Sequence, residues 1–251
     1  MRSEDTPDGV EAAGDGASEM GPFAGGVEIA ARRTRRVADR EGDERGGAAE
    51  QLMASAQASE GRGDLASAIL LYREVIRADN SHVRARIALG VLYARRGEHA
   101  LALEQLEAAR ELAPDSVDAL IGIAGSLTEL KRYEHAEAAL KRALRLEPTR
   151  ADVHGSMGTL NYKRGLYGQA EQELKRALDL DPTYGVAYFY RGECLNQLGR
   201  VDEALEMLER SVQLHPRNPR AFFTMGILYD RKHLPQQAAA MYRKAREVTP
   251  A

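Results

Sequence analysis

VRARIALGVLYARRGEHALALEQLEAARELAPDS, residues Val83 to Ser116, is one copy of a pattern that returns every 34 residues along most of the chain. Prolines recur at this interval at Pro114, Pro148, Pro182, Pro216 and Pro250. Alanines do so at Ala68, Ala102, Ala136, Ala170, Ala204 and Ala238. A fixed period in this range is typical of stacked supersecondary units. The sequence therefore predicts six tandem units: 49–82, 83–116, 117–150, 151–184, 185–218 and 219–251.

Each unit contains two amphipathic stretches with helical spacing. Positions 4, 7, 8 and 11 of a unit form one apolar stripe, and positions 20, 24 and 27 form a second, as two α-helices require. Small residues at position 8 let the two backbones approach: Ala56, Gly90, Ala124, Gly158, Gly192 and Gly226. A large side chain at position 24 packs over that contact: Tyr72, Leu106, Leu140, Leu174, Leu208 and Tyr242. We therefore expect an all-α chain of helix pairs.

The residues between the two helices fit this prediction. Position 15 holds Gly63, Gly97, Gly165 and Gly199, which suit the left-handed residue that ends a helix. Lys131 and His233 stand at the same position in the third and sixth units. Candidate caps for the next helix follow each proline: Asp115 or Ser116, Thr149, Thr183 and Asn218.

These motifs together resemble the tetratricopeptide repeat. The residues that carry the resemblance in the second unit are Leu89, Gly90, Tyr93, Ala102, Leu106, Ala109 and Pro114. The resemblance covers residues 49–251 and implies a right-handed α-solenoid of six helix pairs. In this family, positions 2, 5, 9 and 12 of the first helices line a concave groove that takes a peptide or a helix. The implied function is a protein-interaction scaffold or adaptor.

Carried onto this sequence, the groove positions and their neighbours give a candidate binding surface. It comprises Arg84, Ile87, Val91, Ile121, Gly125, Thr159, Tyr162, Phe189, Tyr190, Glu193, Asn196, Phe223 and Ile227. Small residues in the middle, among them Gly125, Gly155 and Thr159, suggest room for something bulky. Aromatic residues beside such a space are typical of binding hot spots. We expect a partner peptide or helix with bulky apolar anchors. The alternative for Phe189 and Phe223 is that they pack between neighbouring helices.

The sequence contains no constellation of catalytic residues. Six histidines are scattered over different units without metal-ligand spacing, and most are expected at surfaces or turns. No phosphate loop, nucleophile elbow or HExxH helix is present. The single cysteine, Cys194, is expected to be a packed thiol rather than a nucleophile, and it excludes an internal disulfide framework. We therefore expect a protein that is not an enzyme and that uses no cofactor or metal.

Residues 1–47 are rich in Gly, Ala and charged side chains and predict a disordered tail. A short helix over Val27–Arg40 is conceivable, and six arginines in residues 32–45 suggest a docking segment for a partner, a lipid or a nucleic acid. The alternative function is accordingly an assembly factor whose basic segment contacts a membrane or nucleic acid while the repeats recruit a protein. From the folded part, with a net charge of -3 for the whole chain, we expect neither of these contacts.

The remaining expectations concern location and assembly. The N-terminus lacks the apolar core of a secretory signal, and no apolar run is long enough to span a membrane, so we expect a cytoplasmic protein. Of 35 basic residues only six are lysine, which is typical of a GC-rich, bacterial genome. No further helix follows the sixth unit in this sequence, which would leave Met241 and Val248 exposed. Self-association through this uncapped end is therefore expected as a further possibility.

Overall fold

The computed structural model describes residues 47–249, and these residues are helical apart from short turns. Residues 47–61 form the first helix. The later helices are α2 (Leu65–Ala78), α3 (Val83–Arg95), α4 (His99–Leu112), α5 (Val117–Glu129), α6 (Tyr133–Leu146), α7 (Ala151–Lys163), α8 (Tyr167–Leu180), α9 (Gly185–Gln197), α10 (Val201–Leu214), α11 (Pro219–Arg231) and α12 (Pro235–Val248). The predicted tail and its basic segment lie outside the described residues, apart from Gly47.

The turns inside the pairs form as the sequence predicts. Gly63, Gly97, Gly165 and Gly199 all have positive φ, between 75° and 80°. Lys131 and His233 adopt the same conformation at φ 60° and 57°. The left-handed region costs a residue with a Cβ about 1 kcal/mol or more. The repeat thus imposes one turn geometry even where the residue does not favour it.

The predicted caps between the pairs are only partly correct. The side chains of Ser116 and Asn218 cap α5 and α11 by accepting from backbone N–H groups three residues later. Thr149 and Thr183 do not cap, because the chain enters α7 and α9 one residue later than predicted, at Arg150 and Tyr184. The hydroxyl of Thr183 instead donates to Asp181, at 2.7 Å.

Within each pair, a small residue on the first helix lies against a large residue on the second. A Cβ on Gly90 would lie 2.5 Å from Cγ of Leu106, and one on Gly158 would lie 2.5 Å from Cγ of Leu174. The same close approach recurs between Gly226 and Tyr242, where a Cβ would lie 2.5 Å from Cε1 of the ring. In these pairs the glycine leaves room for the large side chain, whereas the first and third repeats have alanine, Ala56 and Ala124, at the same position.

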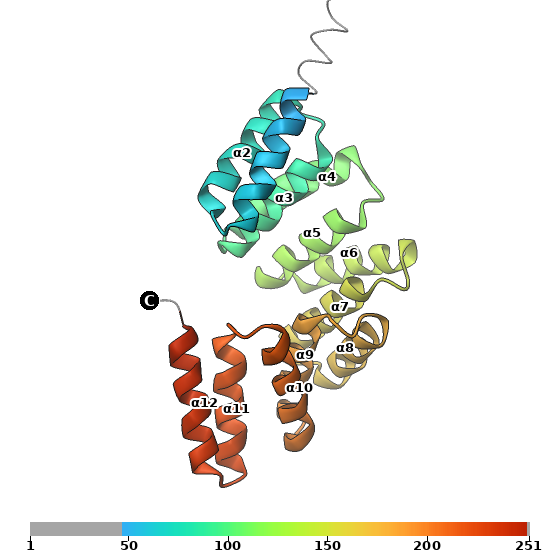
Figure 1. The fold of residues 1–251 in the computed structure, drawn as a ribbon. Coiled ribbons are helices and arrows are strands. Elements are labelled where there is room, and N and C mark those ends of the chain that lie inside the picture. Colours follow the sequence, from blue (N-terminus) through green and yellow to red (C-terminus); the bar gives the residue numbers. More distant parts are fainter. Residues whose placement is uncertain (1–46, 250–251) are drawn as a thin grey trace, which may run out of the picture. The chain divides into compact units, whose positions relative to one another are not determined.

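Successive pairs stack so that each first helix covers the preceding second helix (Figure 1). The result is a right-handed α-solenoid whose described repeats contain four apolar clusters. The fully buried side chains at its centre include Tyr72, Leu89, Leu106, Leu140, Leu174, Leu195, Leu208 and Leu228. Among the described residues, no helix is long and apolar enough to cross a membrane.

Candidate protein-binding groove

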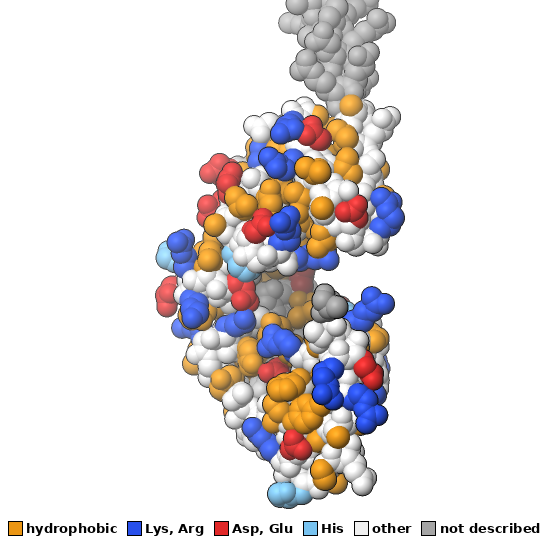
Figure 2. Space-filling model, turned by 90° about the vertical axis from the view of Figure 1, so that its left-hand side faces the viewer, with side chains coloured by type: hydrophobic (Ala, Val, Ile, Leu, Met, Phe, Trp, Pro, Cys, Tyr) orange, Lys and Arg blue, Asp and Glu red, His pale blue; other side chains and the backbone are white. Residues whose placement is uncertain are grey.

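A groove of about 1070 Å³ lies over the last two pairs of the array. Residues from α9, α11 and α12 form its walls, and we call it the C-terminal groove. Its lining consists of Glu193, Asn196, Gln197, Pro219, Arg220, Phe223, Thr224, Ile227, Ala239, Tyr242, Arg243, Ala245, Arg246 and Thr249. Figure 2 shows hydrophobic side chains gathered at the lower end of one face, where the last helices lie, with Lys and Arg side chains beside them.

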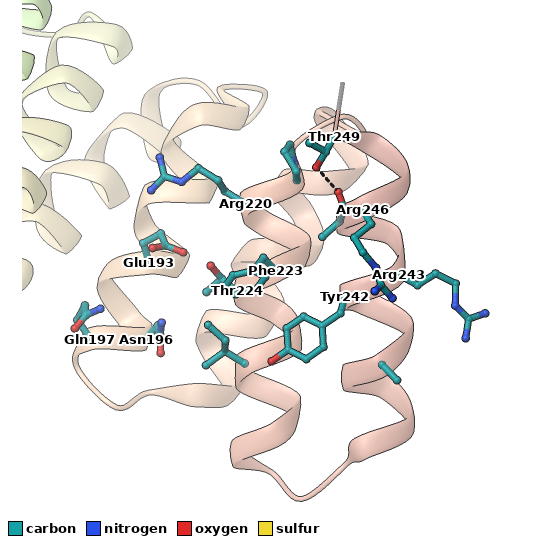
Figure 3. A pocket seen from close by; sticks show the side chains of 14 residues that line it. Glu193, Asn196, Gln197, Arg220, Phe223, Thr224, Tyr242, Arg243, Arg246 and Thr249 are labelled. Carbon is teal, nitrogen blue, oxygen red and sulfur yellow. Dashed lines mark hydrogen bonds between the residues drawn. The ribbon is translucent and has the colours of Figure 1, made fainter. Parts of the chain in front are cut away.

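Phe223 and Tyr242 form the apolar centre of the C-terminal groove. Phe223 projects from α11 and is 54% exposed, which is unusual for a phenylalanine. Its ring centroid lies 5.5 Å from that of Tyr242 on α12 (Figure 3). The hydroxyl of Tyr242 donates to Oδ2 of Asp230 at 2.7 Å, which fixes the ring. Two aromatic faces are therefore held ready at a surface accessible to a partner.

Three arginines make the rim of the C-terminal groove basic. Arg220 stands on α11, and Arg243 and Arg246 stand on α12. The Arg220 guanidinium lies 5.1 Å from the ring centroid of Phe189, within the range of a cation–π contact. None of the ion pairs among residues 47–249 involves these three side chains. The rim can accordingly attract carboxylates on an incoming segment.

On the α9 side, the wall of the C-terminal groove includes a buried carboxylate, that of Glu193. Glu193 accepts a hydrogen bond from the Tyr162 hydroxyl through Oε2 at 3.0 Å. Burial, and after it the negative charge of Glu193, raises the pKa of Tyr162 above its ordinary value. Within the described part of the chain, the other carboxylate oxygen, Oε1, is buried without a hydrogen-bond partner. This wall is therefore polar and rigid beside the exposed aromatic rings.

The structure brings together only some of the residues predicted for the groove. Glu193, Asn196, Phe223 and Ile227 all line the C-terminal groove. Asn196 accepts a hydrogen bond from Arg231 at 2.7 Å, which ties α9 to α11. These four residues thus share one surface at the C-terminal end of the array, and their role in binding stays a prediction.

Phe189 does not line the C-terminal groove, which corrects the sequence-based prediction. It is only 6% exposed and belongs to an apolar cluster with Leu195 and Phe222, so it is not an accessible anchor. The ring of Tyr190 meets the Phe189 ring in a T-shaped arrangement with 5.2 Å between centroids, and the Arg220 guanidinium lies over the Phe189 ring. The alternative of packing between helices holds for Phe189 and not for Phe223.

The remaining predicted residues lie outside the C-terminal groove. Arg84 and Val91 are exposed on α3, and Ile87 and Ile121 are partly buried against the apolar interior. Gly125 is exposed on α5.

Two of the predicted residues belong to α7. Thr159 is held there by a bond from its hydroxyl to the Gly155 carbonyl at 2.9 Å. The ring of Tyr162 is enclosed by Tyr167 and Tyr190. These side chains are available for contacts along the first helices, but the structure does not gather them into one pocket with Phe223.

The predicted space in the middle of the array is partly filled by the chain itself. A Cβ on Gly155 would lie 2.2 Å from Cε1 of Tyr184, and one on Gly122 would lie 2.8 Å from Cδ2 of Leu106. Gly125, in contrast to these two glycines, has nothing within 4 Å of an added Cβ. Gly122 and Gly155 therefore make room for side chains of the chain itself. The sequence pattern alone cannot distinguish this role from space for a ligand.

Comparisons with known proteins place the chain in a family. A family model described as the cilia and flagella-associated protein 70 C-terminal domain, a tetratricopeptide-repeat domain, matches residues 15–251. The chain belongs to this tetratricopeptide-repeat family. Mouse tetratricopeptide repeat protein 14 is 31% identical over 97 residues, which cover 36% of this chain and 13% of the mouse protein. The chain thus matches only a small part of that relative's length.

Solved structures share the fold of the tetratricopeptide-repeat array. Pseudomonas aeruginosa pilF matches with a TM-score of 0.64 at 22% identity, over 82% of this chain and 94% of pilF. The Cut9–Hcn1 hetero-tetramer of the APC/C matches with a TM-score of 0.76 at 16% identity, over 80% of this chain and 40% of the matched chain. At these identities the likeness establishes the fold alone. Solenoids of this kind present extended binding surfaces, which supports a protein-interaction role in general.

Sequence analysis missed the contribution of α12 to the C-terminal groove. The pattern predicts that Tyr242, like the other large side chains at position 24, packs over the contact between the two helices of its pair, and it gives no role to Arg243 or Arg246. The sequence signal that could have found them is a tyrosine followed by two arginines on the second helix of the last tetratricopeptide repeat.

Metal-binding and nucleophilic side chains can be placed for the described residues. Between residues 47 and 249, no group of three or more His, Cys, Asp or Glu side chains could hold a metal ion. Cys194 is fully buried, and burial raises the pKa of its thiol to about 12. His154 departs from the expectation of a surface histidine, because it is buried and bonds Glu173 and the Pro148 carbonyl.

Proposed function

We propose that the chain is a protein-interaction scaffold that captures an apolar segment of a partner protein in the C-terminal groove. The observation that carries this proposal is the exposed ring of Phe223 beside Tyr242 in a groove large enough for several side chains. Well-buried apolar anchors contribute about 1.5 to 3 kcal/mol each. Micromolar affinity, about -8 kcal/mol, is therefore reachable with a few anchors.

The charges of the C-terminal groove narrow the chemistry of this partner. Arg220, Arg243 and Arg246 surround the apolar centre, so acidic side chains flanking the apolar anchors fit best. Exposed charges of this kind steer association more than they add affinity, and salt screens them. Capture is therefore expected to weaken as ionic strength rises.

The test is a capture experiment with matched variants of the full chain. Phe223→Asp places a charge at the centre of the groove, and Leu70→Asp places the same charge at a 61% exposed leucine on α2. Both positions are exposed, so neither variant is expected to unfold. A partner retained by the wild type and by Leu70→Asp but lost by Phe223→Asp supports the proposal. Equal capture by both variants, with circular dichroism confirming their fold, excludes the C-terminal groove as the binding site.

A further inference from the structure

The second helix of every repeat has a large side chain at position 24. In the first five repeats this side chain is buried, and in the sixth it is not. Leu106, Leu140, Leu174 and Leu208 are fully buried and Tyr72 is 1% exposed, whereas Tyr242 is only half-buried and lines the C-terminal groove. The cover comes from the first helix of the next repeat, since Cδ2 of Leu106 would lie 2.8 Å from a Cβ on Gly122 of α5. Among residues 47–249, no helix covers Tyr242 in this way.

Tyr72 is the covered tyrosine at position 24, so its contacts indicate what a helix covering Tyr242 would provide. Its hydroxyl donates to Oε2 of Glu60 at 3.0 Å, just as the Tyr242 hydroxyl donates to Asp230. The covering helix α3 contributes a positively charged side chain. Nη1 of Arg95 donates to the other carboxylate oxygen of Glu60 at 3.3 Å. Asp230 stands at the position of Glu60 and is exposed, and no described basic side chain pairs with it.

The basic residue at position 13 of a first helix is a recurring connection between repeats. Besides the pair of Arg95 and Glu60, Lys163 of α7 forms an ion pair with Glu129 of α5 at 2.9 Å. Arg231 of α11 donates to Asn196 of α9 at 2.7 Å. The end of a first helix thus repeatedly contributes a positive charge to the preceding first helix.

Resting on the proposed function, we propose that the C-terminal groove binds an amphipathic helix of a partner protein. The helix stacks on α11 and α12 as a further first helix would, with its apolar face over Tyr242 and Ala245. A basic residue near its end pairs with Asp230. An acidic residue in its first turn faces Arg246.

The position of Arg246 supports the acidic residue. It occupies position 28, which is also arginine in the second repeat, Arg110, and is apolar in the other four: Ile76, Leu144, Leu178 and Val212. Since Leu106 at position 24 lies against the sixth residue of the next first helix, and the two helices are antiparallel, position 28 faces the first turn. A negative charge in the first turn is also favoured by the helix dipole.

The same comparison disfavours a second copy of the chain as the occupant. Stacked head to tail, a second copy would place its first helix, residues 47–61, over Tyr242. That helix holds Gln51, Ser55 and Ala58 at positions 3, 7 and 10, and all three are exposed. In α3 the same positions hold Ala85, Leu89 and Leu92, which are buried. The outer face of residues 47–61 therefore lacks the apolar stripe that the groove requires.

The chain itself supplies a probe of the stated chemistry. α7 carries Asp152 in its first turn, the buried apolar residues Val153, Met157 and Leu160, and the basic residue Lys163. A peptide of residues 151–163, acetylated and amidated, is labelled with fluorescein and titrated with the full chain in low salt. Gly155→Ala and Gly158→Ala in the peptide raise its helicity and lie off the docking face. A peptide of residues 47–61 is the matched control.

The expected result is a charge-dependent anisotropy change. The α7 peptide binds the wild type, and Asp230→Lys weakens binding roughly two- to fivefold, the range of an exposed ion pair. Combining Asp230→Lys with Lys163→Glu in the peptide restores the affinity. No binding of the α7 peptide, or equal affinity across the four pairings, overturns the inference. So does equal binding of the 47–61 peptide, or self-association of the chain that Asp230→Lys abolishes. A Phe223-dependent partner would then still support the proposed function.

Discussion

Tyr184 occupies the space that the absence of a side chain on Gly155 leaves open. A Cβ on Gly155 would lie 2.2 Å from Cε1 of the Tyr184 ring, far inside van der Waals contact. Tyr184 precedes α9, and Gly155 lies in α7, so this contact sets how closely two successive first helices approach. The glycines in the middle of the array are therefore part of its internal packing.

This contact predicts opposite effects for two glycine substitutions. Gly155→Ala is expected to lower the free energy of unfolding by about 1 to 3 kcal/mol, because the partly buried Tyr184 ring must move. Gly125→Ala is expected to raise it by about 0.5 to 1 kcal/mol, since nothing lies within 4 Å and alanine favours the helix. Urea unfolding of both variants measures the difference. Stabilisation by Gly155→Ala would contradict the packing described for Tyr184.

The left-handed turns give a second prediction. Lys131 has a φ of 60° at the position where four other repeats have glycine. Lys131→Gly is expected to stabilise the chain by about 1 kcal/mol, and Gly97→Ala to destabilise it by a similar amount. Thermal unfolding of the two variants provides the comparison. The same sign for both substitutions would show that this turn does not carry the strain assigned to it.

The contact between Tyr162 and Glu193 gives a third prediction. Tyr162→Phe removes the hydrogen bond to Oε2 and leaves a buried carboxylate unpaired, so the free energy of unfolding is expected to fall by about 1 to 3 kcal/mol. Glu193→Gln retains an acceptor for the Tyr162 hydroxyl and removes the acid, so it is expected to cost less. Denaturant titrations at neutral pH rank the two variants. A larger loss for Glu193→Gln would contradict this account of the wall.

Cys194 gives a prediction that depends on pH. Burial raises the pKa of its thiol from 9.0 to about 12, so the folded chain favours the neutral thiol. The contribution of this residue to stability is therefore complete below pH 9 and is lost as the pH rises toward 12. At pH 8, a thiol reagent is expected to react with the folded chain far more slowly than with the chain in urea. Equal rates would mean that the thiolate is accessible in the folded state.

The 34-residue period was sufficient to predict the helix pairs and the left-handed turns, because both follow from local spacing. The caps were harder, since Thr149 and Thr183 differ from true caps only by one residue of register. Helix position also predicted that Phe223 and Ile227 share a surface with Glu193. It could not predict that Phe189 turns inward beneath Arg220, nor that Tyr242 is uncovered, because both depend on contacts between repeats.

The most direct test of the account is photo-crosslinking at Phe223. The full chain carries a benzoylphenylalanine at position 223 and is expressed in its native host. On irradiation, this group reacts with a protein bound in the C-terminal groove. A second variant of the chain carries the same group at position 70, which is also exposed to solvent but lies on α2. The account predicts a discrete protein adduct from position 223 and none of that mass from position 70. The same adducts from both positions, or an adduct from position 70 alone, would contradict the groove as the site of partner binding.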